Sequence, residues 1–386
     1  MFKNLRTIIL VITLISLTAC VIMLEPISAV SKDNWVKKTS MPTARYDLRA
    51  AVVDGKIYAI GGFPAISMAD YYNGSKYVGF NEEYDPATDT WTSKSAMPAP
   101  LLAFGIAVYQ NKIYCIDGTT IEVYNPANDT WEIKAPMPNP RSQFEANVVN
   151  GKICVIGGRT GGKYSTVTLN EVYDPATGEW TTKAPMPYPV VQYASAVIGN
   201  KIYVMGGQNE FKINNTMTMG TNQIYDTETD TWSLGSSLPT AVWKSAAGVL
   251  APERIYVVGG QPDMSGESTN AVQIYNPVDD NWSIGASMLS ARFGLGVAVL
   301  NDKLYAIGGT NRYLLPGERA MTENEVYTPM GYEPESSTPD PKTPDSLPME
   351  LLVVGISLVI ISVVLLSVAK AKKTRNNQNR LTLPKI

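Results

Sequence analysis

The chain has 386 residues, 45% of them hydrophobic and 17% charged, so it is long enough to bury a sizeable core. Its formal net charge of -3 lacks the basic surplus typical of nucleic-acid-binding proteins, and we expect no nucleic-acid partner. The chain contains no histidine, which excludes Ser-His-Asp and Cys-His catalysis and nearly every metal or haem site with an imidazole ligand.

Residues 1–31 resemble a secretory signal peptide. Lys3 and Arg6 precede an apolar run from Thr7 to Leu24, and small residues that suit a cleavage site follow. Two alternatives stay open at this stage. The segment can remain as an uncleaved anchor, or Cys20 can be the lipidated first residue of a bacterial lipoprotein, because the sequence before it resembles a lipobox.

The stretch 151–187 is the clearest copy of a pattern that recurs six times. Within it, Lys152 to Ile156 predicts a strand that ends at a glycine pair, and Asn170 to Tyr173 predicts the next strand. A turn follows, Trp180 begins a third strand, and Ala194 to Ile198 predicts the strand that comes after it. The six copies align on the pairs Gly61-Gly62, Asp117-Gly118, Gly157-Gly158, Gly206-Gly207, Gly259-Gly260 and Gly308-Gly309.

Cys115 and Cys154 lie in strands of successive copies, one position apart relative to the glycine pair. They should therefore point to opposite faces of their strands. We expect both to be small buried hydrophobic residues, with a disulfide or a reactive thiol as the alternatives.

Tryptophans indicate how the ring of repeats closes. Five copies end with Trp91, Trp131, Trp180, Trp232 and Trp282, whereas the sixth copy has no tryptophan after Tyr327. The missing strand lies at the start of the chain, where Trp35 and the following Met41-Pro42 have the spacing of Trp131 and Met137-Pro138. We predict that Asn34 to Lys38 forms the outer strand of the sixth unit, so that no blade edge is left unpaired.

A period of roughly 40 to 56 residues, with four short strands in each unit, is typical of a β-propeller. With a glycine pair after the second strand, a tyrosine in the third and a tryptophan opening the fourth, residues 34 to about 329 resemble the kelch family. The resemblance implies an all-β, six-bladed β-propeller of four-stranded blades over 32–330. It also implies an interaction scaffold, and we expect the propeller to be monomeric.

The segment after the repeats predicts a membrane anchor. Residues 331–349 are rich in Pro, Ser, Thr and acidic residues, which favours an extended stalk. Residues 350–369 contain an apolar run of 19 residues from Leu351 to Ala369, long enough for a transmembrane helix. Basic residues begin the tail, 370–386, and place it in the cytoplasm, with the propeller outside the cell membrane.

Candidate ligand-binding residues follow the Met-Pro dipeptides. We expect the innermost strand of each blade to begin at Arg45, Leu101, Arg141, Val190, Val242 and Arg292. Asp47, Gln143, Gln192 and Lys244 lie two positions further on and should share the orientation of the first set. The predicted ligand-binding site at the channel mouth comprises Arg45, Asp47, Arg141, Gln143, Gln192, Trp243, Lys244 and Arg292.

Arginines and aromatic residues at a channel mouth suit an acidic peptide or a glycan. The alternative is that the arginines belong to the framework of the repeat. Loops after the glycine pairs should surround the mouth on one face, where binding residues usually lie. These loops are 63–80, 159–169, 208–221, 261–270 and 310–323, whereas the second copy has only Thr119-Thr120.

We therefore expect a membrane-anchored scaffold that binds a protein or glycan, without catalytic residues, metal or cofactor. One alternative is a structural component of the cell envelope. Another is an enzyme, because kelch relatives include a copper oxidase and a sialic-acid epimerase. The copper oxidase needs imidazole ligands that this chain lacks. A sugar-acid epimerase or lyase would use Asp47, Arg49, Glu145 and the channel arginines.

Overall fold

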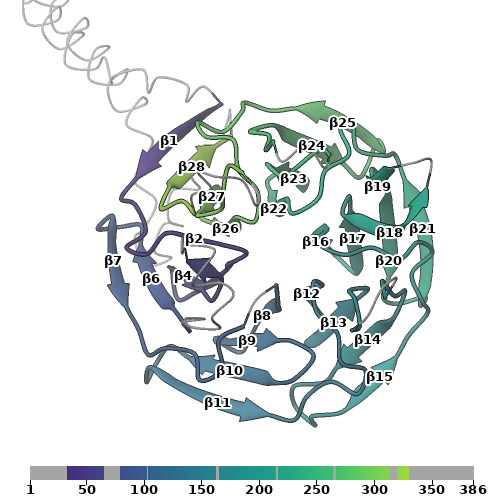
Figure 1. Ribbon diagram of the computed structural model, residues 1–386, viewed down its shortest axis with the longest axis horizontal. Helices are drawn as coiled ribbons and strands as arrows, with labels where there is room; N and C mark the ends of the chain where they lie inside the picture. The colour runs from purple at the N-terminus through teal and green to yellow at the C-terminus, as the bar shows by residue number, and fades with distance from the viewer. Residues whose placement is uncertain are drawn as a thin grey trace, which may run out of the picture. The chain divides into compact units, whose positions relative to one another are not determined.

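The computed structural model describes residues 33–64, 79–101, 103–161, 165–213, 216–263, 267–312 and 320–329. Within these ranges the chain forms six four-stranded antiparallel sheets, arranged as blades around a centre (Figure 1). The predicted signal segment, stalk, transmembrane helix and basic tail lie outside the described residues. Among the residues that are described, no helix is long and apolar enough to cross a membrane.

Each blade runs from an innermost strand to an outer strand, and we number the blades in chain order. Blades 1 and 2 comprise β3 (Arg49–Val53), β4 (Lys56–Ile60), β6 (Asn81–Asp85) and β7 (Thr90–Ser93), then β8 (Gly105–Tyr109), β9 (Lys112–Ile116), β10 (Ile121–Asn125) and β11 (Thr130–Lys134). Blade 3 comprises β12 (Glu145–Val149), β13 (Lys152–Ile156), β14 (Asn170–Tyr173) and β15 (Trp180–Thr182).

The second half of the ring repeats this arrangement. Blades 4 and 5 comprise β16 (Ala194–Ile198), β17 (Lys201–Met205), β20 (Asn222–Asp226) and β21 (Thr231–Gly235), then β22 (Ala246–Leu250), β23 (Arg254–Val258), β24 (Val272–Asn276) and β25 (Asn281–Ile284). Blade 6 comprises β26 (Gly296–Leu300), β27 (Lys303–Ile307), β28 (Asn324–Thr328) and β1 (Asn34–Lys38). The bounds of β13, β14 and β16 are those predicted from the sequence.

The first strand of the chain closes the ring, as predicted. β1 pairs antiparallel with β28, from Asn34 opposite Thr328 to Lys38 opposite Asn324. Trp35 packs on Tyr327 with ring centroids 5.3 Å apart, and its indole Nε1 donates a hydrogen bond to Ala286 O of blade 5 at 2.8 Å. Trp282 makes the same pair of contacts, with Tyr275 and with Ser236 O of blade 4. Trp35 therefore performs in blade 6 the role that Trp282 performs in blade 5.

The second strand of each blade is buried almost throughout, and it ends where two chain segments approach closely. In β13, Ile153 to Ile156 are buried, as expected for a short β-branched run packed on both faces. Gly158 follows with φ +92°, and a Cβ atom there would lie 2.7 Å from Ser142 O. Only glycine fits this position without strain, because L side chains avoid this conformation and the neighbouring backbone occupies the space.

Hydrophobic residues pack between neighbouring blades. Cys115 lies in the cluster between blades 1 and 2, and Cys154 lies in the cluster between blades 3 and 4. Both thiols are free and buried. Because Cys115 faces the preceding blade and Cys154 the following one, the prediction that they point to opposite faces is confirmed. Burial raises the pKa of Cys154 to about 12, so its thiol is neutral and unreactive at neutral pH.

A binding face and a central channel

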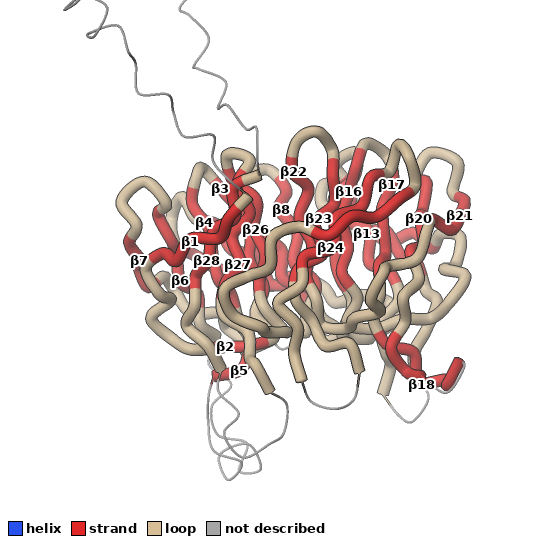
Figure 2. The backbone as a smooth tube through the Cα atoms, turned by 90° about the horizontal axis from the view of Figure 1, so that it is seen from above, coloured by secondary structure: helices blue, strands red, loops and turns tan. Residues whose placement is uncertain are grey.

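One face of the propeller carries the connections between the second and third strands, and we call it the loop-bearing face. β2 (Arg45–Tyr46), β5 (Phe63–Pro64) and the hairpin of β18 (Gln208–Ile213) and β19 (Thr216–Thr218) lie on it. In Figure 2 the labels β2, β5 and β18 all lie at the same end of the blades. The predicted gathering of these connections on one face is thus seen for the residues described.

The root of each long connection is fixed to its own blade. β2 pairs with β5 in blade 1, and single antiparallel bridges do the same in blades 3 to 6: Ser142 with Arg159, Val191 with Gln208, Trp243 with Gln261 and Phe293 with Thr310. Blade 2 instead has a tight turn, in which Asp117 Oδ1 accepts hydrogen bonds from the backbone of Thr119 and Thr120. The loop-bearing face is therefore fixed at its base, and its connection in blade 2 is short.

A ring of hydrogen bonds surrounds the channel mouth. Asp47, Ala103, Gln143, Gln192, Lys244 and Gly294 occupy equivalent positions, and all have φ between 48° and 62°. The backbone N–H of five of them donates to the carbonyl of the equivalent residue in the preceding blade, at 2.7 to 3.0 Å, including Asp47 N to Gly294 O across the closure. We call these six residues the collar.

The collar corrects the predicted start of the innermost strands. Arg45, Arg141 and Arg292 lie in segments that cross each blade, and the innermost strands begin four residues later, as at Arg49 and Glu145. The left-handed residue between crossing segment and strand reverses the chain locally. The arginines and the collar side chains therefore do not share the orientation that simple strand alternation predicts.

The three arginines belong to the blade framework, which was the alternative interpretation. Arg45 and Arg292 are fully buried and Arg141 is 3% exposed. Arg45 Nη2 lies 2.7 Å from Glu82 Oε2, Arg292 pairs with Glu325 at 3.3 Å, and Arg141 pairs with Glu171. Their guanidinium groups also donate to the carbonyls of Gly61, Gly157 and Gly308. They hold the glycine turns in place and are not exposed to a ligand at the channel mouth.

The residue on the third strand changes together with the residue at the arginine position. A glutamate on the third strand pairs with each of the three arginines. Where Val190 and Val242 replace the arginine, Gln223 and Gln273 replace the glutamate. Each glutamine accepts a backbone N–H and returns a hydrogen bond to the carbonyl of the same residue, Tyr188 or Thr240. The rule keeps every buried charge paired, as a low-dielectric interior requires.

Blade 2 breaks this rule. Leu101 occupies the arginine position, but the third strand carries Glu122, which is fully buried. Its Oε1 accepts a hydrogen bond from Ala99 N at 3.0 Å, while its Oε2 has no hydrogen-bond partner. Burial raises the pKa of Glu122 to about 7. Sequence reasoning overlooked this residue, although the absent arginine signals it.

Lys244 lies across the collar from blade 5 to blade 1. Its Nζ is 2.7 Å from Asp47 Oδ2 and 5.6 to 5.7 Å from the ring centroids of Tyr46, Trp243 and Phe293. Gly294 of the intervening blade leaves room, since a Cβ atom there would lie 2.6 Å from Asp47 Oδ1. Asp47, Trp243 and Lys244 thus meet at the mouth, but the cation is 7% exposed and already paired with a carboxylate.

Below the collar the channel contains a chamber of about 150 Å³. Arg49 Nη2 of blade 1 lies 2.7 Å from Glu145 Oε1 of blade 3, and Arg49 Nε donates to Phe104 O of the blade between them. Ser195 Oγ donates to Asn147 Oδ1 at 3.0 Å. Burial raises the pKa of Glu145 to about 7, although Arg49 acts in the opposite direction. The chamber therefore combines a carboxyl group able to exchange a proton near neutral pH with a guanidinium group.

Gln143 and Gln192 are the collar residues that keep free hydrogen-bonding capacity. Both are half-buried, and their side-chain amides make no hydrogen bond to another residue in the described ranges. Together with the fixed roots of the loops, they form the polar part of the loop-bearing face. The arrangement suits recognition through hydrogen bonds more than capture of an acidic group.

Comparison with known proteins agrees with this architecture. A family profile described as the KLHDC2/KLHL20/DRC7 Kelch-repeats domain matches residues 120–309, and the Kelch motif matches residues 44–98. Kelch-like protein terF of Aspergillus terreus is 44% identical over 64 residues, which are 17% of this chain and 13% of that protein. Human Kelch repeat and BTB domain-containing protein 8 is 34% identical over 88 residues, 23% of this chain and 14% of that protein.

The solved structure of YjhT covers 74% of this chain and 95% of its own, with a TM-score of 0.62 and 15% sequence identity. This likeness concerns the fold alone. These two curated relatives match over less than a sixth of their own length, so their full architectures do not transfer to this chain. The repeats seen in the sequence, the closed ring and the matches together show that the chain carries a kelch-repeat domain folded as a six-bladed β-propeller.

Proposed function

We propose that the chain is a binding scaffold that recognises a protein partner with its loop-bearing face. Kelch propellers typically act as protein-binding scaffolds, and the structure of this face carries the proposal. Five connections rise from roots fixed to their blades, the connection of blade 2 stays low, and the collar lies at their centre. Long loops on a rigid base are where binding residues usually concentrate.

The chemistry of the face favours a neutral polar ligand surface over the acidic one expected from the arginines. Arg45, Arg141, Arg292 and Lys244 each have a carboxylate partner within the propeller. An acidic ligand would have to displace those carboxylates at a cost. Gln143 and Gln192, in contrast, offer amides that can both donate and accept hydrogen bonds.

We further propose that the scaffold acts outside the cell and is anchored in the cell membrane. The support is in the sequence: a signal-like segment in 1–31, and an apolar run over 350–369 that basic residues follow at once. In this arrangement the stalk, 331–349, would hold the propeller away from the bilayer and leave its face open for a partner in an adhesive contact.

The test of the binding face is a matched pair of double variants in the full chain. Gln143→Gly with Gln192→Gly removes both amides and suits the positive φ, as Gly294 does at the same position in blade 6. The control, Asp54→Gly with Asn301→Gly, changes exposed residues of positive φ in the turns at the opposite end of the innermost strands.

Crosslinking in the native cells, followed by quantitative mass spectrometry, would give the amount of partner recovered. We expect recovery to fall at least tenfold for the glutamine variant and to stay unchanged for the control. Equal recovery from both variants would reject the loop-bearing face as the binding surface.

The chamber below the collar supports one second candidate, an enzyme of the sugar-acid epimerase or lyase type. Glu145, with a pKa near 7, would exchange the proton. Arg49, which pairs with Glu145 in the free protein, would exchange that partner for the carboxylate of the substrate. Incubation of the full chain with sugar acids, monitored by NMR, tests this function. Turnover that is lost in Glu145→Gln would establish the enzyme, and no turnover by the wild type would eliminate it.

A further inference from the structure

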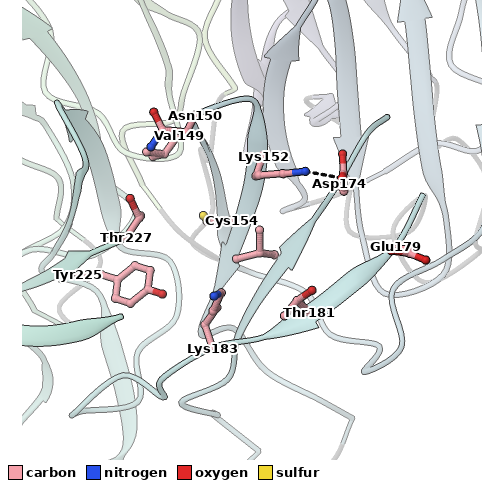
Figure 3. A pocket seen from close by; sticks show the side chains of 11 residues that line it. Val149, Asn150, Lys152, Cys154, Asp174, Glu179, Thr181, Lys183, Tyr225 and Thr227 are labelled. Atoms are coloured by element: carbon pink, nitrogen blue, oxygen red, sulfur yellow. Dashed lines mark hydrogen bonds and ion pairs between the residues drawn. The ribbon is translucent and has the colours of Figure 1, made fainter. Parts of the chain in front are cut away.

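A pocket of about 300 Å³ lies between blades 3 and 4, away from the collar. Val149, Cys154 and Val172 contribute apolar surface, and Lys152 and Lys183 stand among the polar residues of its wall. Figure 3 shows Cys154 on β13 and Lys183 just after β15, the outer strand of blade 3, with Tyr225 of blade 4 also lining the pocket. The Lys152 ammonium group is paired with Asp174.

The pocket exists because blade 3 lacks a tyrosine. The third residue of the second strand is a tyrosine in the five other blades and Cys154 in blade 3. In those blades the ring contacts a tyrosine of the next blade, with centroids 5.5 to 6.5 Å apart: Tyr58 with Tyr124, Tyr114 with Tyr173, Tyr203 with Tyr275, Tyr256 with Tyr327 and Tyr305 with Tyr84. Tyr225 is the corresponding partner at the blade 3 interface and lines the pocket instead.

Blade 1 shows one way in which the equivalent space is filled by polar groups. Tyr58 Oη donates a hydrogen bond to Glu83 Oε2 at 2.6 Å, and Lys94 Nζ lies 3.1 Å from the same carboxylate oxygen. A phenol, a carboxylate and an ammonium group thus form one chain of contacts on the surface of the blade. Tyr58 and Glu83 are directly opposite each other in the strand register.

Blade 3 differs from blade 1 in two of these groups. Cys154 replaces the tyrosine, and Val172 lies where blade 1 has Glu83, as an aliphatic residue does in blades 2, 4, 5 and 6. Cys154 and Val172 lie directly opposite each other, as Tyr58 and Glu83 do. Lys183 corresponds to Lys94, because the backbone N–H of each lysine donates to the first residue of the third strand, Asn170 O or Asn81 O. Among the described residues no carboxylate lies within salt-bridge distance of Lys183. The pocket therefore lacks the phenol ring that the other five blades have, and it contains a cation that no carboxylate in the described residues pairs with.

We propose that this pocket binds a small aromatic acid, a phenol-sized ring that carries a carboxylate. The ring would lie over Cys154 and Val172 against Tyr225, and the carboxylate would pair with Lys183. The volume fits, because a cavity of about 150 Å³ already holds benzene, and 300 Å³ leaves room for a short acid chain. Asp174 and Glu179, also on the wall, disfavour a second negative charge on the ligand.

Binding of para-hydroxyphenylacetate to the full chain, measured by calorimetry, tests the proposal, with the neutral para-cresol as the matched probe. We expect saturable single-site binding of the acid to the wild type. Lys183→Met should lower the affinity for the acid at least tenfold and leave the affinity for para-cresol unchanged. Val172→Glu introduces the carboxylate that blade 1 has at this position. It should abolish binding of the acid, because the new glutamate would pair with Lys183.

Cys154→Tyr refills the pocket, and we expect it to abolish binding of both probes while the thermal midpoint holds or rises. Cys154→Ser keeps the space and should retain binding, so a folding defect of the tyrosine variant would not leave the question open. An acetylated and amidated Tyr-Glu dipeptide that binds more tightly than the free acid would assign the ligand to a protein segment. Wild-type affinity in Cys154→Tyr and Val172→Glu, or no binding of the acid at millimolar concentration, would overturn the proposal.

Discussion

The buried ion pair of Arg141 and Glu171 follows the rule that charge on the crossing segment is matched by charge on the third strand. Blade 4 performs the same structural task with Val190 and Gln223 and no charge at all. Because both combinations occur in one molecule, we expect that Arg141 and Glu171 can be replaced together by valine and glutamine. Replacing one partner alone would leave a buried charge without compensation.

Arg141→Val should therefore lower the free energy of unfolding by about 3–5 kcal/mol, because Glu171 is left buried and unpaired. Adding Glu171→Gln rebuilds the combination of blade 4 and should recover most of the loss. Urea denaturation of both variants gives the comparison. A double variant that is no more stable than the single one would show that the rule does not govern these blades.

Glu122 makes the stability depend on pH. Since burial raises its pKa to about 7, the native state holds this proton more tightly than the unfolded state, whose value is near 4.5. The stabilising contribution is complete below about pH 4.5 and is lost as the pH rises through about 7. A glutamine here could also donate to the carbonyl of Ala99, as Gln223 does to that of Tyr188.

Glu122→Gln should accordingly match the wild type near pH 4 and exceed it by about 2–3 kcal/mol near pH 8. The measurement is the difference in unfolding free energy between variant and wild type across this range, which cancels the similar contribution of Glu145. A difference that stays constant with pH would mean that Glu122 does not titrate in this way.

At the scale of elements, the closing strand β1 joins the two ends of the domain. Trp35 is 6% exposed and packs on Tyr327, whereas its neighbour Val36 is 48% exposed. Trp35→Ala should cost about 3–5 kcal/mol of unfolding free energy, the usual range for a buried tryptophan. Val36→Ala, the matched control, should change stability by less than about 0.5 kcal/mol. Equal thermal midpoints for the two variants would contradict a role of β1 in closing the ring.

The sequence was sufficient to predict β1, β13, β14 and β16, because their signals repeat in register around the chain. It failed at the collar, where Asp47, Gln143, Gln192 and Lys244 adopt positive φ. Those side chains carry no glycine-like signal for that conformation, and only the ring of hydrogen bonds between blades explains it. The misplaced strand starts then put three framework arginines in the predicted site. The pairing of Arg with Glu and of Val with Gln was present in the sequence and would have identified them.

For the whole molecule, the six-fold framework leaves specificity to the positions that differ between blades. The collar combines Lys244, which pairs with Asp47 across the mouth, with two glutamine amides and a glycine. The connections around it are long except in blade 2, which has a tight turn. The pocket of blade 3 arises in the same way, where one tyrosine of the pattern is absent. Both candidate binding regions are thus departures from the repeat on an otherwise uniform scaffold.

Hydrogen–deuterium exchange of the full chain, alone and with its crosslinked partner, tests the binding face most directly. We predict slower exchange in the loops 159–169, 208–221 and 261–270, and no change in the opposite turns at 54–55 and 301–302. Slower exchange confined to those turns or to the outer strands, with the loops unchanged, would contradict the assignment of the loop-bearing face as the recognition surface.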